Sequence, residues 1–108
     1  MKDVYVKDFS NLENMLSRFY VNASVLEGYD VIYAIYEQDE YDGDAFVLLQ
    51  KRGDGEYYEV NSSHCSCYGL EWDMEHTSEA ALKVRYEDGR SWGAFNSSKN
   101  ALKEHFNW

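Results

Sequence analysis

The densest group of chemically reactive side chains in this sequence is the run His64-Cys65-Ser66-Cys67. Imidazole and thiolate are the ligands that zinc takes in a tetrahedral site. One residue separates the two cysteines, which is shorter than the usual zinc spacing, and no second pair follows. In an extended segment Cys65 and Cys67 share one face and His64 takes the other. The run therefore offers three candidate metal ligands, with buried, reduced thiols as the simpler interpretation.

A thiol nucleophile is the second chemistry that this run could support. Activation requires a base within hydrogen-bond reach of the thiol. His64 would point away from Cys65 in a strand, so His76 or His105 would have to approach instead. The sequence contains no phosphate-binding loop, dinucleotide fingerprint or serine elbow. We therefore expect a protein without catalytic activity and without a cofactor.

Carboxylates are concentrated in a second group, residues 37–44, where five of eight residues are acidic. The spacing does not fit the calcium loop of an EF-hand. Alternate residues on a strand lie about 6.8 Å apart, so a row of carboxylates can imitate the phosphates of a nucleic acid. With the acidic residues of the next turn, we expect one strongly negative end of a sheet. The candidate partner-binding residues are Glu37, Asp39, Glu40, Tyr41, Asp42, Asp44, Asp54, Glu56 and Glu59.

The charge of the whole chain is consistent with a surface that binds a basic partner, and also with acidity that serves only solubility. The 108 residues carry a net charge of −10, and residues 37–59 hold eight acidic and two basic side chains. Such a chain should repel free nucleic acid and membrane surfaces and attract a basic protein surface. Acidity that serves only solubility is the alternative. Neither a signal peptide nor an apolar run long enough for a membrane is present, so we expect a cytoplasmic protein.

The elements that must position these residues follow from apolar spacing and capping residues. We expect a first helix over residues 10–20, capped by Ser10 with Glu13 as its capping-box partner. Apolar, β-branched runs separated by Asp-Gly turns predict antiparallel strands. Residues 78–95 are predicted either as a second helix, capped by Thr77 or Ser78, or as a hairpin. Ser97 or Ser98 is expected to cap a last helix. The three expected strands are residues 30–38, 45–51 and 56–62.

This order of elements predicts one α+β domain of 108 residues. We expect an αβββαα arrangement, in which a three- or four-stranded antiparallel meander is packed by about three helices. The helices should cover one face of the sheet. The tyrosines of the strands and turns then become candidate anchors for a partner, since Tyr combines an apolar ring with a hydroxyl: Tyr33, Tyr36, Tyr41, Tyr57 and Tyr68.

The segment from Glu56 to Glu71, EYYEVNSSHCSCYGLE, resembles a stretch in small uncharacterised proteins of phages and bacterial mobile elements. The similarity continues through Trp72 and acidic residues into Thr77-Ser78-Glu79-Ala80-Ala81-Leu82. That family implies no activity and no catalytic residues. It implies a context in which small acidic proteins, such as anti-CRISPR inhibitors, bind host nucleases.

The leading hypothesis is therefore a phage-type binding protein that inhibits a host nucleic-acid enzyme, such as a nuclease or CRISPR effector, through its basic surface. DNA mimicry by the acidic turns would supply the electrostatic attraction. A small metal-binding or thiol-dependent protein that uses His64, Cys65 and Cys67 is the alternative. A structural component that forms a homodimer is a third possibility.

Overall fold

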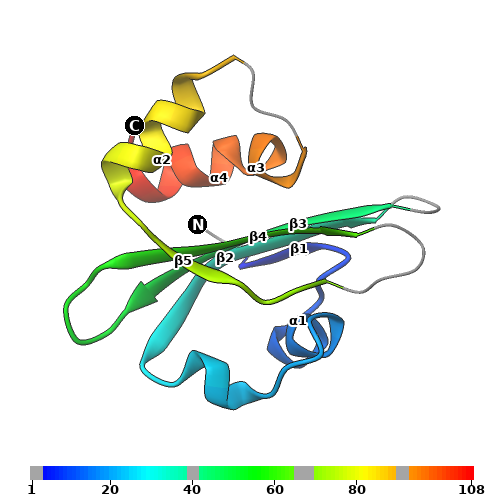
Figure 1. Ribbon diagram of the computed structural model, residues 1–108. Coiled ribbons are helices and arrows are strands. Elements are labelled where there is room, and N and C mark those ends of the chain that lie inside the picture. The colour runs from blue at the N-terminus through cyan, green and yellow to red at the C-terminus, as the bar shows by residue number, and fades with distance from the viewer. Residues whose placement is uncertain (1–3, 39–41, 65–69, 90–92) are drawn as a thin grey trace.

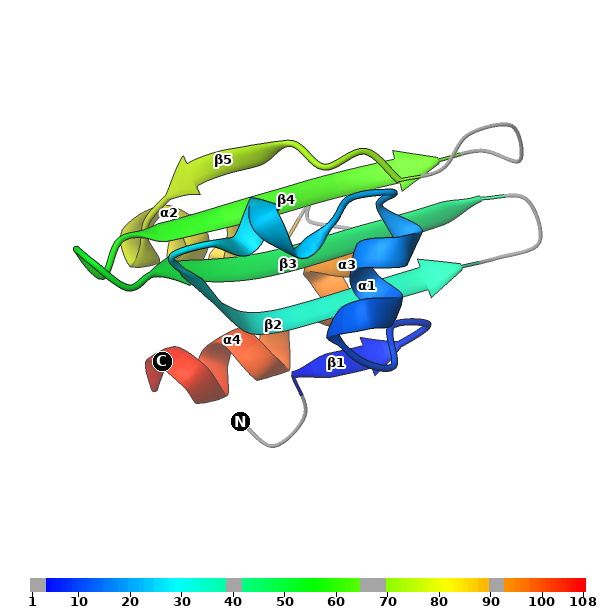
Figure 2. The same cartoon turned by 90° about the horizontal axis from the view of Figure 1, so that it is seen from below.

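A sheet of five strands runs through the middle of the described part of the chain (Figures 1 and 2). The structure is a computed structural model that describes residues 4–38, 42–64, 70–89 and 93–108. The strands lie side by side in the order of the sequence. The first pairs with the second in parallel, and the remaining pairs are antiparallel. The strands are β1 (Tyr5–Lys7), β2 (Tyr29–Gln38), β3 (Gly43–Lys51), β4 (Tyr57–His64) and β5 (Met74–Thr77).

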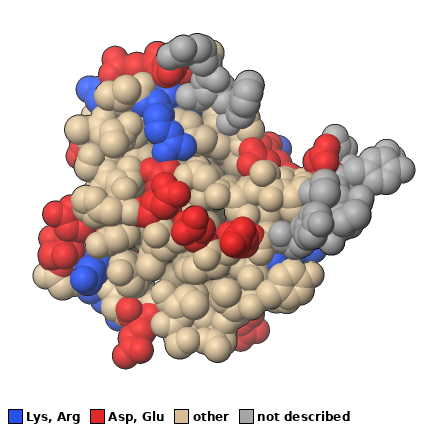
Figure 3. All heavy atoms as spheres, viewed as in Figure 1, with Lys and Arg blue, Asp and Glu red and all other residues tan. Residues whose placement is uncertain are grey.

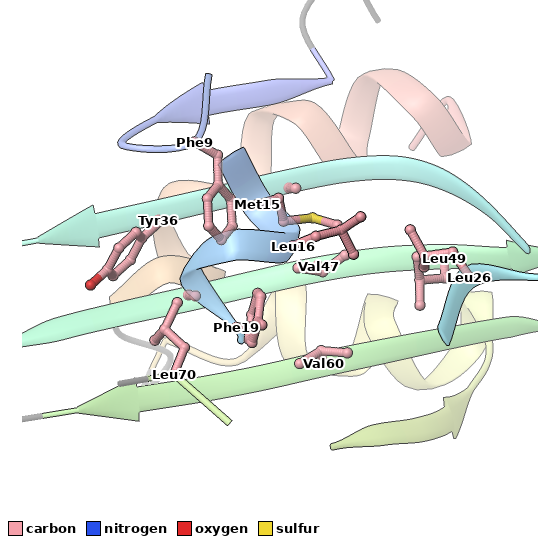
Figure 4. Close-up of a cluster of buried hydrophobic side chains, with 12 residues drawn as sticks. Phe9, Met15, Leu16, Phe19, Leu26, Tyr36, Val47, Leu49, Val60 and Leu70 are labelled. Atoms are coloured by element: carbon pink, nitrogen blue, oxygen red, sulfur yellow. The ribbon is translucent and has the colours of Figure 1, made fainter. Parts of the chain in front are cut away.

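One face of the sheet is covered by the short helix α1 (Leu12–Arg18) and the 3-10 turn η1 (Ala23–Leu26). Figure 4 shows the core on this side, in which Met15, Leu16 and Phe19 of the helix segment face Val47 and Val60 of the strands. Alternate strand residues point to the same face, so each strand contributes every second side chain to this core. The apolar stripe of the first helix therefore has the role that its spacing predicts.

The opposite face is covered by three helices that follow the sheet in the sequence (Figure 1). Their buried side chains, among them Leu82, Phe95 and Leu102, pack against Phe46 and Leu48 of β3. Phe46 and Phe95 meet edge to face, with 5.4 Å between their ring centroids. The helices are α2 (Glu79–Glu87), α3 (Gly93–Ser97) and α4 (Lys99–Phe106).

The predicted α+β class and the antiparallel meander are confirmed, but the arrangement of the helices was predicted wrongly. Helices cover both faces of the sheet. Strands β2 to β5 form a four-stranded antiparallel meander, and β1 adds a fifth, parallel strand beside β2. The physical reason lies in residues 45–49 of β3, which are buried in succession. A strand that is apolar at consecutive positions needs cover on both sides.

The helix boundaries differ from the predicted ones by small, explicable amounts. Asn11, not Ser10, caps α1, because its side chain accepts the backbone N–H of Asn14 at 2.8 Å. Asn14 in turn accepts the N–H of Ser10, the residue before the cap, at 3.1 Å, in place of the predicted acceptor Glu13. Ser78 caps α2 as predicted, and residues 79–87 are helical, which excludes the rival hairpin there.

Candidate protein-binding surface

The two acidic turns predicted to form one negative surface lie at opposite ends of the sheet. Gln38 of β2 pairs with Gly43 of β3 at one end, whereas Gln50 of β3 pairs with Tyr57 of β4 at the other. A meander places successive turns at opposite ends because the strand between them crosses the whole sheet, as Figure 2 shows. The carboxylates of the two turns therefore form no common surface, and this part of the prediction is wrong.

Glu59, one of the predicted contact residues, is an internal residue. It is 5% exposed and forms an ion pair with Arg85 of α2. Burial by itself raises the pKa of this carboxyl, but hydrogen bonds from Arg85, Asn61 and Thr77 outweigh burial and hold the pKa below its usual value. Arg85 also lies over the ring of Phe95, 4.1 Å from its centroid. Glu59 therefore joins β4 to α2 and is not available to a partner.

Glu37 and Asp44 are brought together, as a cross-strand pair, and each has a partner within the chain. The Asp44 carboxylate accepts the backbone N–H of Ala94 at 2.6 Å, at the beginning of α3. A side chain at Gly93 would collide with this carboxylate, so glycine permits the close approach. Glu37 accepts the Ser97 hydroxyl at 2.8 Å. Both carboxylates thus attach α3 to the sheet.

The remaining predicted contact residues are divided between the ends of the sheet. Asp54 and Glu56 belong to the turn between β3 and β4, where Asp54 accepts the N–H of Glu56 at 2.9 Å and Glu56 pairs with His76 at 3.2 Å. Asp42 is exposed beside the start of β3. Asp39, Glu40 and Tyr41 lie outside the described residues.

A row of carboxylates that the sequence analysis missed lies on the segment that contains β5. Glu71, Asp73 and Glu75 are exposed at alternate positions. No described residue forms a hydrogen bond or ion pair with these three carboxylates. In Figure 3 acidic side chains gather across the middle of the face on which β5 is the nearest strand. We call Glu71, Asp73 and Glu75 the acidic edge.

The residues between these carboxylates explain why they point outward. Leu70 is buried in the core beneath the sheet, and Trp72 and Met74 pack against that core. The ring of Trp72 meets Phe19 edge to face at 5.0 Å. Strict alternation of apolar and acidic residues from position 70 to 75 is a strand pattern with one buried face. This alternation was the signal that could have located the acidic edge from the sequence.

Two of the predicted tyrosine anchors are core residues, because Tyr33 is 4% and Tyr36 is 3% exposed. Tyr57 is half-buried and packs against Phe106, with 5.2 Å between ring centroids. Tyr41 and Tyr68 lie outside the described residues. Tyr33 and Tyr36 therefore cannot act as surface anchors, and only Tyr57 keeps part of its ring accessible among the described candidates.

The candidate metal ligand His64 faces a tyrosine. Its Nε2 shares a hydrogen bond with the Tyr36 hydroxyl, whose pKa is raised by burial. Cys65 and Cys67 lie outside the described residues, so the metal or thiol hypothesis stays a prediction. Among the described residues, no group of three histidine, cysteine or acidic side chains could hold a metal ion.

The comparisons with known proteins leave the fold and the surface as the basis for inference. No protein family, curated protein or solved structure matches this chain. The resemblance to small phage and mobile-element proteins therefore stays a prediction. None of the helices in the described ranges is both long and apolar enough to cross a membrane.

Proposed function

We propose that this chain is a non-catalytic binding protein that docks its acidic edge on a basic, nucleic-acid-binding surface of another protein and blocks it. The observation that carries the proposal is the row formed by Glu71, Asp73 and Glu75, three exposed carboxylates without a described internal partner. Regularly spaced negative charges are what a basic nucleic-acid cleft binds. The net charge of −10 would add long-range attraction.

The context for this activity is the cytoplasm of a bacterial host. The resemblance of residues 56–71 to phage and mobile-element proteins is the reason to expect such an origin. With that origin, a host nuclease or CRISPR effector would be the target. Charge complementarity raises the rate of association and selects partners more than it raises affinity. Inhibition by this route requires only that the protein occupy the cleft, so it needs no catalytic group and no cofactor.

The proposal is tested by competition with nucleic acid. The protein is immobilised and exposed to the heparin-binding fraction of a bacterial lysate, which is enriched in nucleic-acid-binding proteins. We expect it to retain a nuclease that duplex DNA displaces, and the variant Glu71→Gln/Asp73→Asn/Glu75→Gln to retain at least about tenfold less.

The matched control is Glu13→Gln/Glu27→Gln/Glu87→Gln, which removes the same charge from exposed positions elsewhere. It should retain the nuclease nearly as well as the unmodified protein. Equal loss in the two triple variants would show that net charge alone drives binding. The proposed function would be contradicted if duplex DNA did not displace the retained nuclease. It would also be contradicted if the acidic-edge variant retained the nuclease as well as the unmodified protein.

A further inference from the structure

The acidic edge coincides with an open edge of the sheet. β5 pairs with β4 on one side, and no described strand pairs with its other side. The extended chain before β5 stays beside β4, since the N–H of Glu71 donates to the Ser62 hydroxyl at 2.9 Å. An edge strand presents backbone N–H and C=O groups that can pair with another extended chain.

The two faces of this edge differ in chemistry. Glu71, Asp73 and Glu75 lie toward the side of α2, because Glu75 is the ladder partner of Glu59, which pairs with Arg85 of that helix. Trp72 and Met74 lie toward the opposite side and are only half-buried against the core that α1 covers. A strand added here would therefore meet carboxylates on one face and apolar surface on the other.

We infer that the β5 edge accepts an extended segment of the partner protein as a sixth strand, in which lysine or arginine alternates with aliphatic residues. The inference rests on the proposed function and specifies how its partner is held. The basic side chains would lie beside Glu75 and Asp73, and the aliphatic ones beside Met74 and Trp72. Opposite charges and apolar pairs at neighbouring cross-strand positions stabilise such an addition.

The charges disfavour a second copy of this chain as the added strand. Antiparallel pairing of two such segments in a register centred on Asp73 would place Glu71, Asp73 and Glu75 against the same residues of the other copy. Like charges directly opposite one another are destabilising. Carboxylates on an edge strand therefore suppress self-association and leave a basic strand as the compatible occupant.

The test uses a blocked peptide of about eight residues that alternates lysine and valine, the length of a typical strand. Binding to the full chain is followed by the amide shifts of residues 71–77 in NMR spectra. Two further peptides carry N-methyl groups, one on the lysine amides and the other on the valine amides. Alternate amides of a strand point to opposite edges, so only one of the two methylated peptides loses its bonds to β5.

We expect one methylated peptide to bind at least about tenfold more weakly and the other to stay within about twofold of the parent. A peptide with glutamate in place of lysine should not bind. Identical affinity of the two methylated peptides, whether retained or lost, would overturn the inference, as would the absence of any shift with the parent peptide. If the acidic-edge variant nevertheless loses DNA-competed binding to a nuclease, strand addition is wrong and the proposed function stands.

Discussion

Glu59 and Glu75 occupy directly opposite positions in the ladder between β4 and β5, yet they have different roles. Glu59 is buried and pairs with Arg85, whereas Glu75 is exposed and has no described partner. The difference arises because α2 covers β4 and leaves the edge strand open. Whether a carboxylate supports the fold or stays exposed to solvent therefore depends on which element covers its strand, and the local density of acidic residues does not reveal it.

The same contrast separates the two acidic segments of the chain. In residues 37–44, the described carboxylates Glu37 and Asp44 hold α3 through Ser97 and Ala94. In residues 71–75, the carboxylates hold nothing within the described chain. Substitutions in the first group should change stability and those in the second should change binding.

Glu59→Gln should have the largest effect on stability. It removes the buried carboxylate that pairs with the guanidinium of Arg85, and breaking a buried ion pair is strongly destabilising. Since the Arg85 side chain is 39% exposed, water screens part of the loss. We expect the free energy of unfolding to fall by about 2 kcal/mol, measured by urea denaturation at neutral pH.

The matched control for that substitution is Glu75→Gln, which removes the same charge from the facing strand. It should change the free energy of unfolding by less than about 0.5 kcal/mol, as is usual for an exposed position. Equal destabilisation by the two substitutions would contradict the distinction between an internal and an external carboxylate.

Asp44→Ala should have the next largest effect. It removes the acceptor for the Ala94 N–H at the beginning of α3, and loss of a carboxylate that accepts from a helix terminus costs about 1 kcal/mol. The neighbouring substitution Asp42→Ala, at an exposed position, serves as the control. In thermal unfolding experiments, the melting temperature of Asp44→Ala should be clearly lower than that of Asp42→Ala. A melting temperature shared by both would mean that α3 does not depend on this bond.

The sequence was sufficient for the features that depend on local pattern. Consecutive apolar residues in β2 and β3 predicted the central strands, and Ser78 predicted the beginning of α2. The pairing of Glu59 with Arg85 could not be predicted, since it joins residues that are 26 positions apart through the packing of a helix on the sheet. The alternation from Leu70 to Glu75 indicates a strand with one buried face, but its place at the open edge of the sheet depends on the order of all five strands.

The smallest effect in this comparison concerns pH. The pKa of Glu59 is lowered in the folded protein from its ordinary value of 4.5, so its ionised form stabilises the fold. That contribution is complete above the unfolded pKa and is lost as pH falls through the lower, folded pKa. The difference in unfolding free energy between the unmodified protein and Glu59→Gln should therefore narrow from about pH 6 to about pH 3. Urea titrations across this range measure the difference. A difference in unfolding free energy that stays constant or increases on acidification would show that the carboxylate of Glu59 is not the charged partner of Arg85.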